Sequence, residues 1–584
     1  MSNIYGMLSS GISGLMAAQA GIDVSGHNIA NVNTDGYSRQ TVSLDTQSPA
    51  LYSQNMFGRG VTVEDINRVY DELLASSVRE ENAELEYYKT LQTGLEKAKV
   101  YFNELEDGSG LGEALRDYFN AWSDVANNPP DESEEALVKR QTLVETTETL
   151  TQKIHDGYDA LSAIQKESDY NITEYVNQIN QISDNITYLN KQIAVVEATD
   201  AHANDYRDQR DALLKELSEL VNVNVYEREN TQIAVYVGGN ALVDENESFK
   251  LYAERDTEQD NKVSVKWGTS ESIKGEIDIS SQITGGKLGA EFETRDETIA
   301  GYKDELDELA STLINETNRI HSLGQGVIRL NQITSTNGVP NPSFVMGEDA
   351  GAFPVDVNKG TFRITVYDSS GDPVDNYDID IDPTKDNLNN VIAKISAADG
   401  DVSGGKIQAS LSLNNTVKIY SEAGYSFAFT DDTSNFLVGA GINSYFKGTG
   451  AEDIEIADLI QDNNLYIATG RTGADGDNEI AKDIADLKFK EVFEGESVTI
   501  DEFYGYFVSG IGSDKHKVDI FVETKQNALD EMELKLEGVK GVSMDEELTL
   551  LLRFQRSYEA SARFITTVDS MLEKLINGLG LVGR

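Results

Sequence analysis

Hydrophobic residues near the N-terminus recur at helical spacing along one narrow line. Over residues 1–30 this line consists of Ile4, Leu8, Ile12, Leu15, Ile22 and Ile29, with Ala17, Ala18 and Ala20 beside it. The spacing predicts an amphipathic helix. Five glycines, at positions 6, 11, 14, 21 and 26, interrupt the pattern. At about 1 kcal/mol each relative to alanine, they cost the helix about 5 kcal/mol, so we expect it to form mainly against a partner.

The C-terminal end carries a longer hydrophobic repeat. Ser543 and Glu546 form an S-x-x-E capping box, which marks the start of a helix. The apolar positions beyond it follow a heptad seam and consist of Leu548, Leu551, Phe554, Tyr558, Ile565, Val568, Leu572 and Leu575. Such a seam is exposed in a lone helix. Because both ends of the chain carry a stripe of this kind, we expect the terminal helices to pack together and to form an assembly interface.

The interior alternates between helical and sheet-like patterns. An a/d repeat over 172–196 predicts a long packed helix, and a turn near 200 leads into a second helix that we expect to run antiparallel to it. Elsewhere, alternation with a period of two predicts strands. The blocks are helical over about 71–221 with a break at 127–130, strand-rich over 222–284, helical over 287–322, strand-rich over 326–448 and helical again from about 450.

The predicted fold class is α+β and multidomain, an elongated helical rod with a terminal coiled-coil domain and β-rich inserted outer domains. The β-rich blocks interrupt the helical rod, and the chain leaves and re-enters it. The expected domains are a terminal coiled-coil polymerisation domain (1–75 plus 541–584), a helical rod domain (76–221 plus 285–325 plus 449–540), a small β-rich insertion (222–284) and an outer β-rich insertion domain (326–448).

The chain is strongly acidic. It has 101 Asp and Glu residues against 48 Lys and Arg, for a formal net charge of -53. Phosphate backbones and anionic lipid surfaces repel such a chain, so we expect no nucleic-acid partner and no membrane partner. No apolar run approaches the ~20 residues that span a bilayer. The N-terminus also lacks the basic and compact apolar regions of a cleavable signal peptide, so an export route would have to keep it.

The chain offers little catalytic chemistry. Because it contains no cysteine, disulfides, thiolate nucleophiles and sulfur-ligated metals are excluded. Its five histidines form no H-E-x-x-H pair or other metal-ligand spacing. The G-x-S-x-G elbow and the P-loop lysine are also missing. We therefore predict that the protein is not an enzyme and that it takes no cofactor and no metal.

Motifs at the two ends resemble those of bacterial flagellar axial proteins. The first is GLMAAQAG at 14–21 followed by HNIANVNTDGY at 27–37, and the second is GVSMDEEL at 541–548 followed by LRFQRSYEASARFI at 552–565. The stretch YSRQ at 37–40 is more similar to the hook-associated proteins of the hook–filament junction than to rod or hook proteins. Interior segments at 208–217, at 285–289 with 295–297, and at 476–478 add to the match. The turn of the first motif contains Asn28, Asn31, Asn33, Gly36 and Tyr37.

The resemblance implies a structural subunit of the flagellum that joins the hook to the filament. Its packed terminal helices would line a tubular homopolymer as an inner coiled coil. The implied partners are other copies of the chain, the flagellar hook protein, a second hook–filament junction protein and an export chaperone at the C-terminus. The resemblance also implies flagellar type III export and an extracellular location at the hook–filament junction.

Two alternatives remain open from the sequence. The chain could be another axial subunit of the rod or hook, although the 37–40 stretch and the interior segments count against this. It could also be an extracellular binding protein that acts through its β insertions. Removal of about 326–450 would discriminate, because a junction protein should still assemble whereas a binding protein should lose its activity.

Overall fold

The computed structural model describes residues 2–52, 55–102, 110–128, 133–199, 201–228, 231–257, 261–268, 277–347, 353–398, 400, 405–472, 474, 476–493 and 497–579. Its contacts divide the chain into two compact units. Unit 1 consists of Met1–Thr93, Glu167–Glu293 and Lys517–Arg584, and unit 2 consists of Gly94–Lys166 and Thr294–His516. Helices and several small sheets occur in both, so the predicted α+β class is confirmed. The bounds of the four predicted domains stay a prediction.

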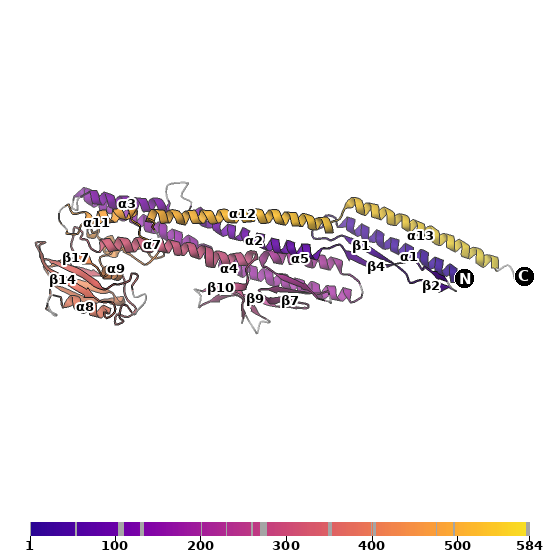
Figure 1. The fold of residues 1–584 in the computed structure, drawn as a ribbon, viewed down its shortest axis with the longest axis horizontal. Helices are drawn as coiled ribbons and strands as arrows, with labels where there is room; N and C mark the ends of the chain where they lie inside the picture. The colour runs from indigo at the N-terminus through magenta and orange to yellow at the C-terminus, as the bar shows by residue number, and fades with distance from the viewer. Residues whose placement is uncertain are drawn as a thin grey trace. The chain divides into compact units, whose positions relative to one another are not determined.

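The two chain ends of unit 1 form a helical pair. Helix α1, Ser2–Ala30, lies beside helix α13, Met544–Leu579 (Figure 1). Both predicted terminal helices are therefore confirmed. The same region also contains strands that the sequence interpretation missed. They are β1, Gln40–Thr46, β2, Ala50–Tyr52, β3, Asn55–Phe57, and β4, Val61–Arg68, with β1 antiparallel to β4 and β2 antiparallel to β3.

Unit 1 also contains a helical scaffold. Parts of helix α2, Glu72–Tyr101, and helix α12, Ile500–Lys540, pack through Ala75, Val78, Leu85, Leu529 and Leu536. Helix α4, Glu134–Glu197, contributes its second half, in which Ile172, Ile179, Ile186 and Ile193 of the a/d repeat are completely buried. Helix α5, Asn204–Leu220, follows it. The side chains of Arg207 and Arg210 bond to Glu197 and Asn190, so α4 and α5 run antiparallel as predicted.

Two small antiparallel sheets of unit 1 share a core with α4, α5 and helix α6, Gly286–Glu293. Their strands confirm the period-two pattern of the 222–284 block. The first sheet contains β5, Asn224–Glu227, β6, Ile233–Val237, β7, Asn240–Asp244, and β8, Glu247–Ser248. The second contains β9, Lys250–Asp256, β10, Lys262–Gly268, and β11, Ile277–Asp278, and the 3₁₀ turn η1, Ser280–Gln282, follows it.

Unit 2 combines helices with a compact β-rich part. The long helices are α3, Leu111–Asn127, the first half of α4, and α7, Ile299–His321, which the π-helical segment η2, Thr294–Thr298, precedes. The β-rich part has two three-stranded antiparallel sheets around one hydrophobic core. Its elements are β12, Gln332–Thr334, β13, Gly360–Tyr367, β14, Pro373–Ile381, α8, Leu388–Ser396, β15, Ile407–Leu411, η3, Leu413–Asn415, β16, Val417–Ser421, β17, Ser426–Asp432, and α9, Phe436–Ala440.

Two expected helical blocks need correction. Within the expected helical block 71–221, helix α2 ends at Tyr101 and helix α3 begins at Leu111, with the described Phe102 and Gly110 outside both helices. We expected helix from about 450. The described residues between 446 and 493 instead form short helices and strands, and the long helix begins at Ile500. The short elements are β18, Phe446–Lys447, β19, Glu455–Ile456, α10, Asp458–Asp462, η4, Asn464–Tyr466, α11, Glu479–Ala485, and η5, Asp486–Phe489. Among the described residues, no helix is long and apolar enough to cross a membrane.

Candidate assembly surface at the chain termini

The contact between α1 and α13 runs along the glycines of α1. A β-carbon added to Gly21 would lie 2.6 Å from the Phe554 ring, and one added to Gly11 would lie 2.8 Å from Ile565. Since the α1 position rises as the α13 position falls, the helices are antiparallel. Three glycines that we read as a cost to the helix, Gly11, Gly14 and Gly21, therefore allow α13 to approach closely.

A second face of α1 packs against the β1–β4 hairpin. The hydroxyl of Ser13 accepts a hydrogen bond from the backbone of Val61 at 3.2 Å. A β-carbon on Gly60, whose φ is +106°, would lie 3.0 Å from the Cα of Ser10 and closer still to Ser13. Ala17 and Val24 are buried. Helix α1 is thus held between a helix on one side and a hairpin on the other.

Most of the predicted interface residues are only half-buried between α1, α13 and the β1–β4 hairpin. On α1 the side chains of Ile4, Leu8, Leu15, Ile22 and Ile29 are half-buried, and Ile12 is 40% exposed. On α13, Val568 is buried, and Leu551, Phe554, Tyr558, Ile565 and Leu572 are half-buried, while Leu548 and Leu575 are 45% and 44% exposed. A single chain therefore leaves much of its terminal apolar surface open to solvent.

Two glycine substitutions should have opposite effects on this pair. Gly21→Val inserts carbon atoms into the Phe554 contact, and such overpacking costs about 1–3 kcal/mol. Gly26→Ala adds a methyl group where nothing lies within 4 Å, so it should stabilise α1 by about 0.5–1 kcal/mol. We expect amide hydrogen exchange in α13 to become about tenfold faster in the first variant and not to accelerate in the second. Equal rates in both would contradict a glycine-dependent contact.

The turn after α1 is closed by Asn28. Its buried side-chain amide donates to the Gln40 carbonyl at 2.8 Å, and its oxygen accepts from the Gln40 N–H at 2.9 Å. The Tyr37 hydroxyl donates to the same oxygen at 2.8 Å. Burial and the nearby Asp205 carboxylate raise the pKa of Tyr37 above its ordinary value, which keeps this donor protonated. Asn28 therefore joins the end of α1 to the start of β1.

The other predicted turn residues have smaller roles. The Asn31 side chain donates to the His27 carbonyl at 3.0 Å, and Gly36 has a φ of +78°, which favours glycine. Asn33 is exposed. The five turn residues thus differ widely in how much of the local structure depends on them.

Arg68 and several residues of the family motifs tie this turn to the scaffold. The Ser38 N–H and the Arg68 guanidinium both bond to Asp208 of α5, at 2.9 and 3.0 Å, and Arg68 also pairs with Asp211 at 2.5 Å. Arg39 pairs with Glu547 of α13 at 2.8 Å. The contacts join the segments at 37–40, 208–217 and 541–548. These three segments are separate motifs in the sequence, and the fold brings them into contact.

Replacing Asn28 should weaken this turn much more than replacing Asn33. Asn28→Ala leaves both backbone polar groups of Gln40 without their partner, and each buried unsatisfied group costs about 1–3 kcal/mol. We expect a loss of about 2 kcal/mol in the stability of unit 1, measured by urea unfolding with Trp267 fluorescence. Asn33→Ala should change the free energy of unfolding of unit 1 by less than about 0.5 kcal/mol. A similar loss in both variants would contradict the role of Asn28.

Three family profiles match the chain. The profile described as "Flagellar hook-associated protein FlgK helical domain" matches residues 95–333. "Flagella basal body rod protein" matches 8–37, and "Flagellar basal body rod FlgEFG protein C-terminal" matches 539–578. The two rod-protein matches fall on α1 with its turn and on α13, the segments that pack together.

Relatives of known name match over almost the whole chain. "Flagellar hook-associated protein 1" of Bacillus subtilis is 26% identical, covering 98% of this chain and 97% of that protein. The Escherichia coli protein of the same name is 24% identical, covering 98% and 99%. In fold, the chain is similar to the flagellar hook junction protein FlgK from Burkholderia pseudomallei, with a TM-score of 0.51. The two sequences are 15% identical, and the match covers 80% of this chain and 100% of the other. Over almost its whole length, the chain is thus similar to proteins named flagellar hook-associated protein 1.

Proposed function

We propose that this chain is a structural subunit of the bacterial flagellum that joins the hook to the filament. The observation that carries this proposal is the packing of the two chain ends against each other within the family's terminal motifs. A helix pair whose apolar edges stay exposed in one chain is suited to further association. The role is mechanical, and none of its steps requires catalysis.

The assembly interface of the proposed subunit consists of the terminal residues named above. Tyr5, Ile12 and Met16 lie on the α1 face away from α13 and are 67%, 40% and 64% exposed. Burying such side chains contributes about 1.5–3 kcal/mol each. Copies of the chain would cover this surface in a tubular homopolymer, so that assembly completes the core that one chain leaves open.

The partners and the location follow from the same role. The neighbours are copies of the chain, the flagellar hook protein on one side and a second hook–filament junction protein on the other. The chain leaves the cell by flagellar type III export, assisted by an export chaperone at its C-terminus, and functions outside the cell. Partial unfolding is compatible with this route, because the glycine-rich α1 has little helical stability of its own.

Loss of the gene distinguishes this role from the role of a rod or hook subunit. In a strain of the source organism without this chain, electron microscopy should show complete hooks without attached filaments. Hooks that are absent or truncated would instead indicate a rod or hook subunit. Filaments attached as in the parent strain would contradict a junction role.

The β-rich part of unit 2 allows a test of the binding-protein alternative. Its core is formed by residues from within 330–442, so most of its stability is internal. A chain lacking 330–442, which keeps Asn443 and Tyr445 beside His321 of α7, should still be incorporated at hook ends. Loss of a surface-binding activity with normal motility would instead favour the binding protein.

A further inference from the structure

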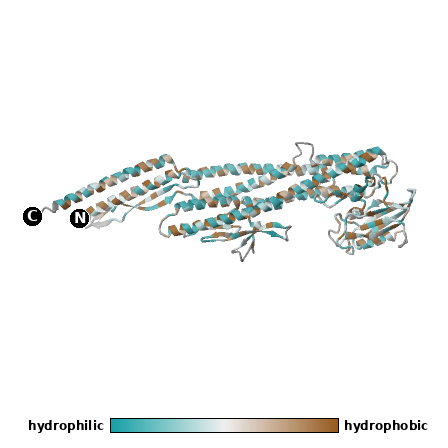
Figure 2. Cartoon of the chain, turned by 180° about the vertical axis from the view of Figure 1, so that it is seen from behind, coloured by the Kyte–Doolittle hydropathy of each residue, from teal (hydrophilic) through white to brown (hydrophobic). Residues whose placement is uncertain are grey.

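The outward side of α13 combines exposed leucines with exposed arginines. Leu548 and Leu552 are 45% and 55% exposed. Arg553, Arg556 and Arg563 are exposed, and among the described residues they form no ion pair. At 100° per residue these five side chains share one side of the helix with the exposed Asp545 and Glu559, away from the side that meets α1. The three arginines outnumber the two carboxylates, so this side carries a net positive charge. Figure 2 shows hydrophobic and hydrophilic residues alternating along α13, the helix nearest the C label.

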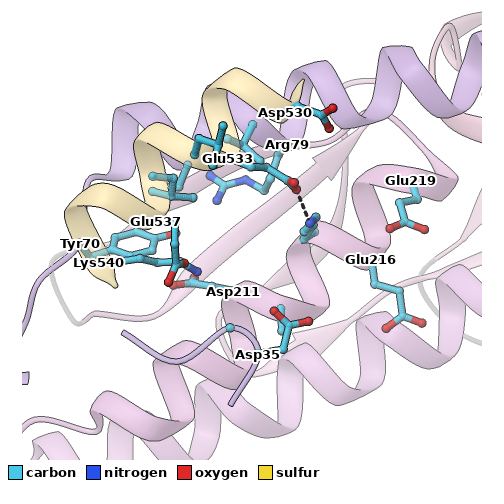
Figure 3. A pocket seen from close by; sticks show the side chains of 17 residues that line it. Asp35, Tyr70, Arg79, Asp211, Glu216, Glu219, Asp530, Glu533, Glu537 and Lys540 are labelled. Atoms are coloured by element: carbon cyan, nitrogen blue, oxygen red, sulfur yellow. Dashed lines mark hydrogen bonds and ion pairs between the residues drawn. The ribbon is translucent and has the colours of Figure 1, made fainter. Parts of the chain in front are cut away.

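A groove of unit 1 has the complementary composition. It lies between α5 and α12, has a volume of about 770 Å³, and is floored by the buried side chains of Ala75, Val78 and Leu536. Carboxylates from both helices surround this apolar floor (Figure 3). They are Asp211, Glu216 and Glu219 of α5 and Asp530, Glu533 and Glu537 of α12.

Most of the cations in the groove are already engaged. Lys215 pairs with Glu533 at 2.6 Å, and Arg79 pairs with Glu72 at 2.9 Å. Glu216 and Glu537 are exposed and form no ion pair within the described parts of the chain. The groove thus has an apolar floor and an excess of negative charge on its walls.

We propose that the outward side of α13 of one copy docks into the α5–α12 groove of a second copy. The two leucines would cover the apolar floor, while the three arginines would meet Glu216, Asp530 and Glu537, the wall carboxylates that form no ion pair among the described residues. This contact rests on the proposed function and specifies one interface of the polymer. Because each copy carries a net charge of -53, association needs local charge complementarity to offset the general repulsion. The contact joins different surfaces of the two copies, which allows open-ended or ring-like growth.

Cysteine cross-linking tests the contact directly, because the chain has no cysteine of its own. Full-length chains carrying Arg556→Cys and Glu537→Cys are produced together, and isolated hooks with their attached chains are oxidised. We expect a cross-linked dimer from the mixture and none from Glu537→Cys alone. Lys535→Cys replaces Glu537→Cys as the control, because Lys535 is exposed on α12 and does not line the groove. Incorporation without a specific cross-link would overturn the docking proposal and leave the junction role intact.

Charge reversal gives an independent test. Arg556→Glu or Glu537→Lys alone should reduce incorporation at hook ends at least about tenfold, since like charges would then face each other. A chain carrying both substitutions should recover most of the loss, and Lys535→Glu should have no effect. If the double variant assembles no better than the single variants, these side chains do not meet. If the unmodified chain fails to reach hook ends, the proposed function itself is wrong.

Discussion

Ile565→Asp should abolish incorporation at hook ends while unit 2 remains folded. Ile565 lies over Gly11 of α1, where an added β-carbon would be only 2.8 Å away. At this half-buried position the close approach restricts the hydration shell of a carboxylate, and an unpaired charge that loses part of its hydration destabilises the contact. The α1–α13 pair would therefore open, and the surface that the proposed polymer needs would be lost.

Ser557→Asp is the matched control for this substitution. Ser557 lies on the same helix and is exposed, so an aspartate there stays hydrated. Incorporation is measured by immunolabelling of hook ends, and the fold of unit 2 by fluorescence of the buried Trp122. Normal incorporation of Ile565→Asp would remove the α1–α13 contact from the assembly mechanism. Equal failure of Ser557→Asp would show that any added charge on α13 prevents assembly.

The stability of unit 2 should fall by about 3 kcal/mol as the pH decreases from 7 to 4, because of His321. This residue ends α7 and is buried beside Trp122 and Tyr445. The Ala468 N–H donates to Nε2 at 2.9 Å, so Nδ1 carries the proton and donates to the Asn443 carbonyl at 2.8 Å. A second proton on Nε2 would break the bond from Ala468 and create a buried charge.

The sign of the effect follows from the proton balance. Burial lowers the pKa of His321 from 6.5 to about 4. Between these values the unfolded chain binds more protons than the folded chain, so stability decreases as the pH falls. A shift of this size corresponds to about 3 kcal/mol at 1.36 kcal/mol per pKa unit.

A comparison of variants isolates this effect from the titration of the many carboxylates. In a Trp267→Phe background, Trp122 is the only tryptophan of the chain and reports on unit 2. The free energy of unfolding is measured in urea at pH 7 and pH 4. Between these pH values it should fall by about 3 kcal/mol less in His321→Gln than in the parent. His516→Gln, which removes an exposed histidine of unit 2, serves as the control. Identical pH dependence in the His321 variant would contradict a neutral buried imidazole.

The sequence predicted best where a single periodicity persisted over many residues. The isoleucines of α4 repeat often enough to define both the helix and its buried side, and the heptads of α13 define the helix. For α1 the pattern predicted the helix but not its contacts. The largest side chains suggested the packing face, whereas the closest contact with α13 is made by glycines, which carry no hydrophobic signal.

Structure that depends on distant residues was harder to predict. The β1–β4 hairpin was missed, although alternation in Thr41–Leu44 and Val61–Val63 could have indicated it. The link from Ser38 and Arg68 to Asp208 joins residues 170 and 140 positions apart. Local patterns contain no information about such pairings. The 37–40 and 208–217 motifs were visible in the sequence, but their contact was not.

Labelling of the purified chain on isolated hooks tests the central claim most directly. Hooks are mixed with the full chain, stained with a gold-labelled antibody and examined by electron microscopy. The junction role predicts label confined to the one end of each hook that faces the filament, and no label there with Ile565→Asp. Label along the length of the hook, or none on hooks while the chain is folded, would contradict the account.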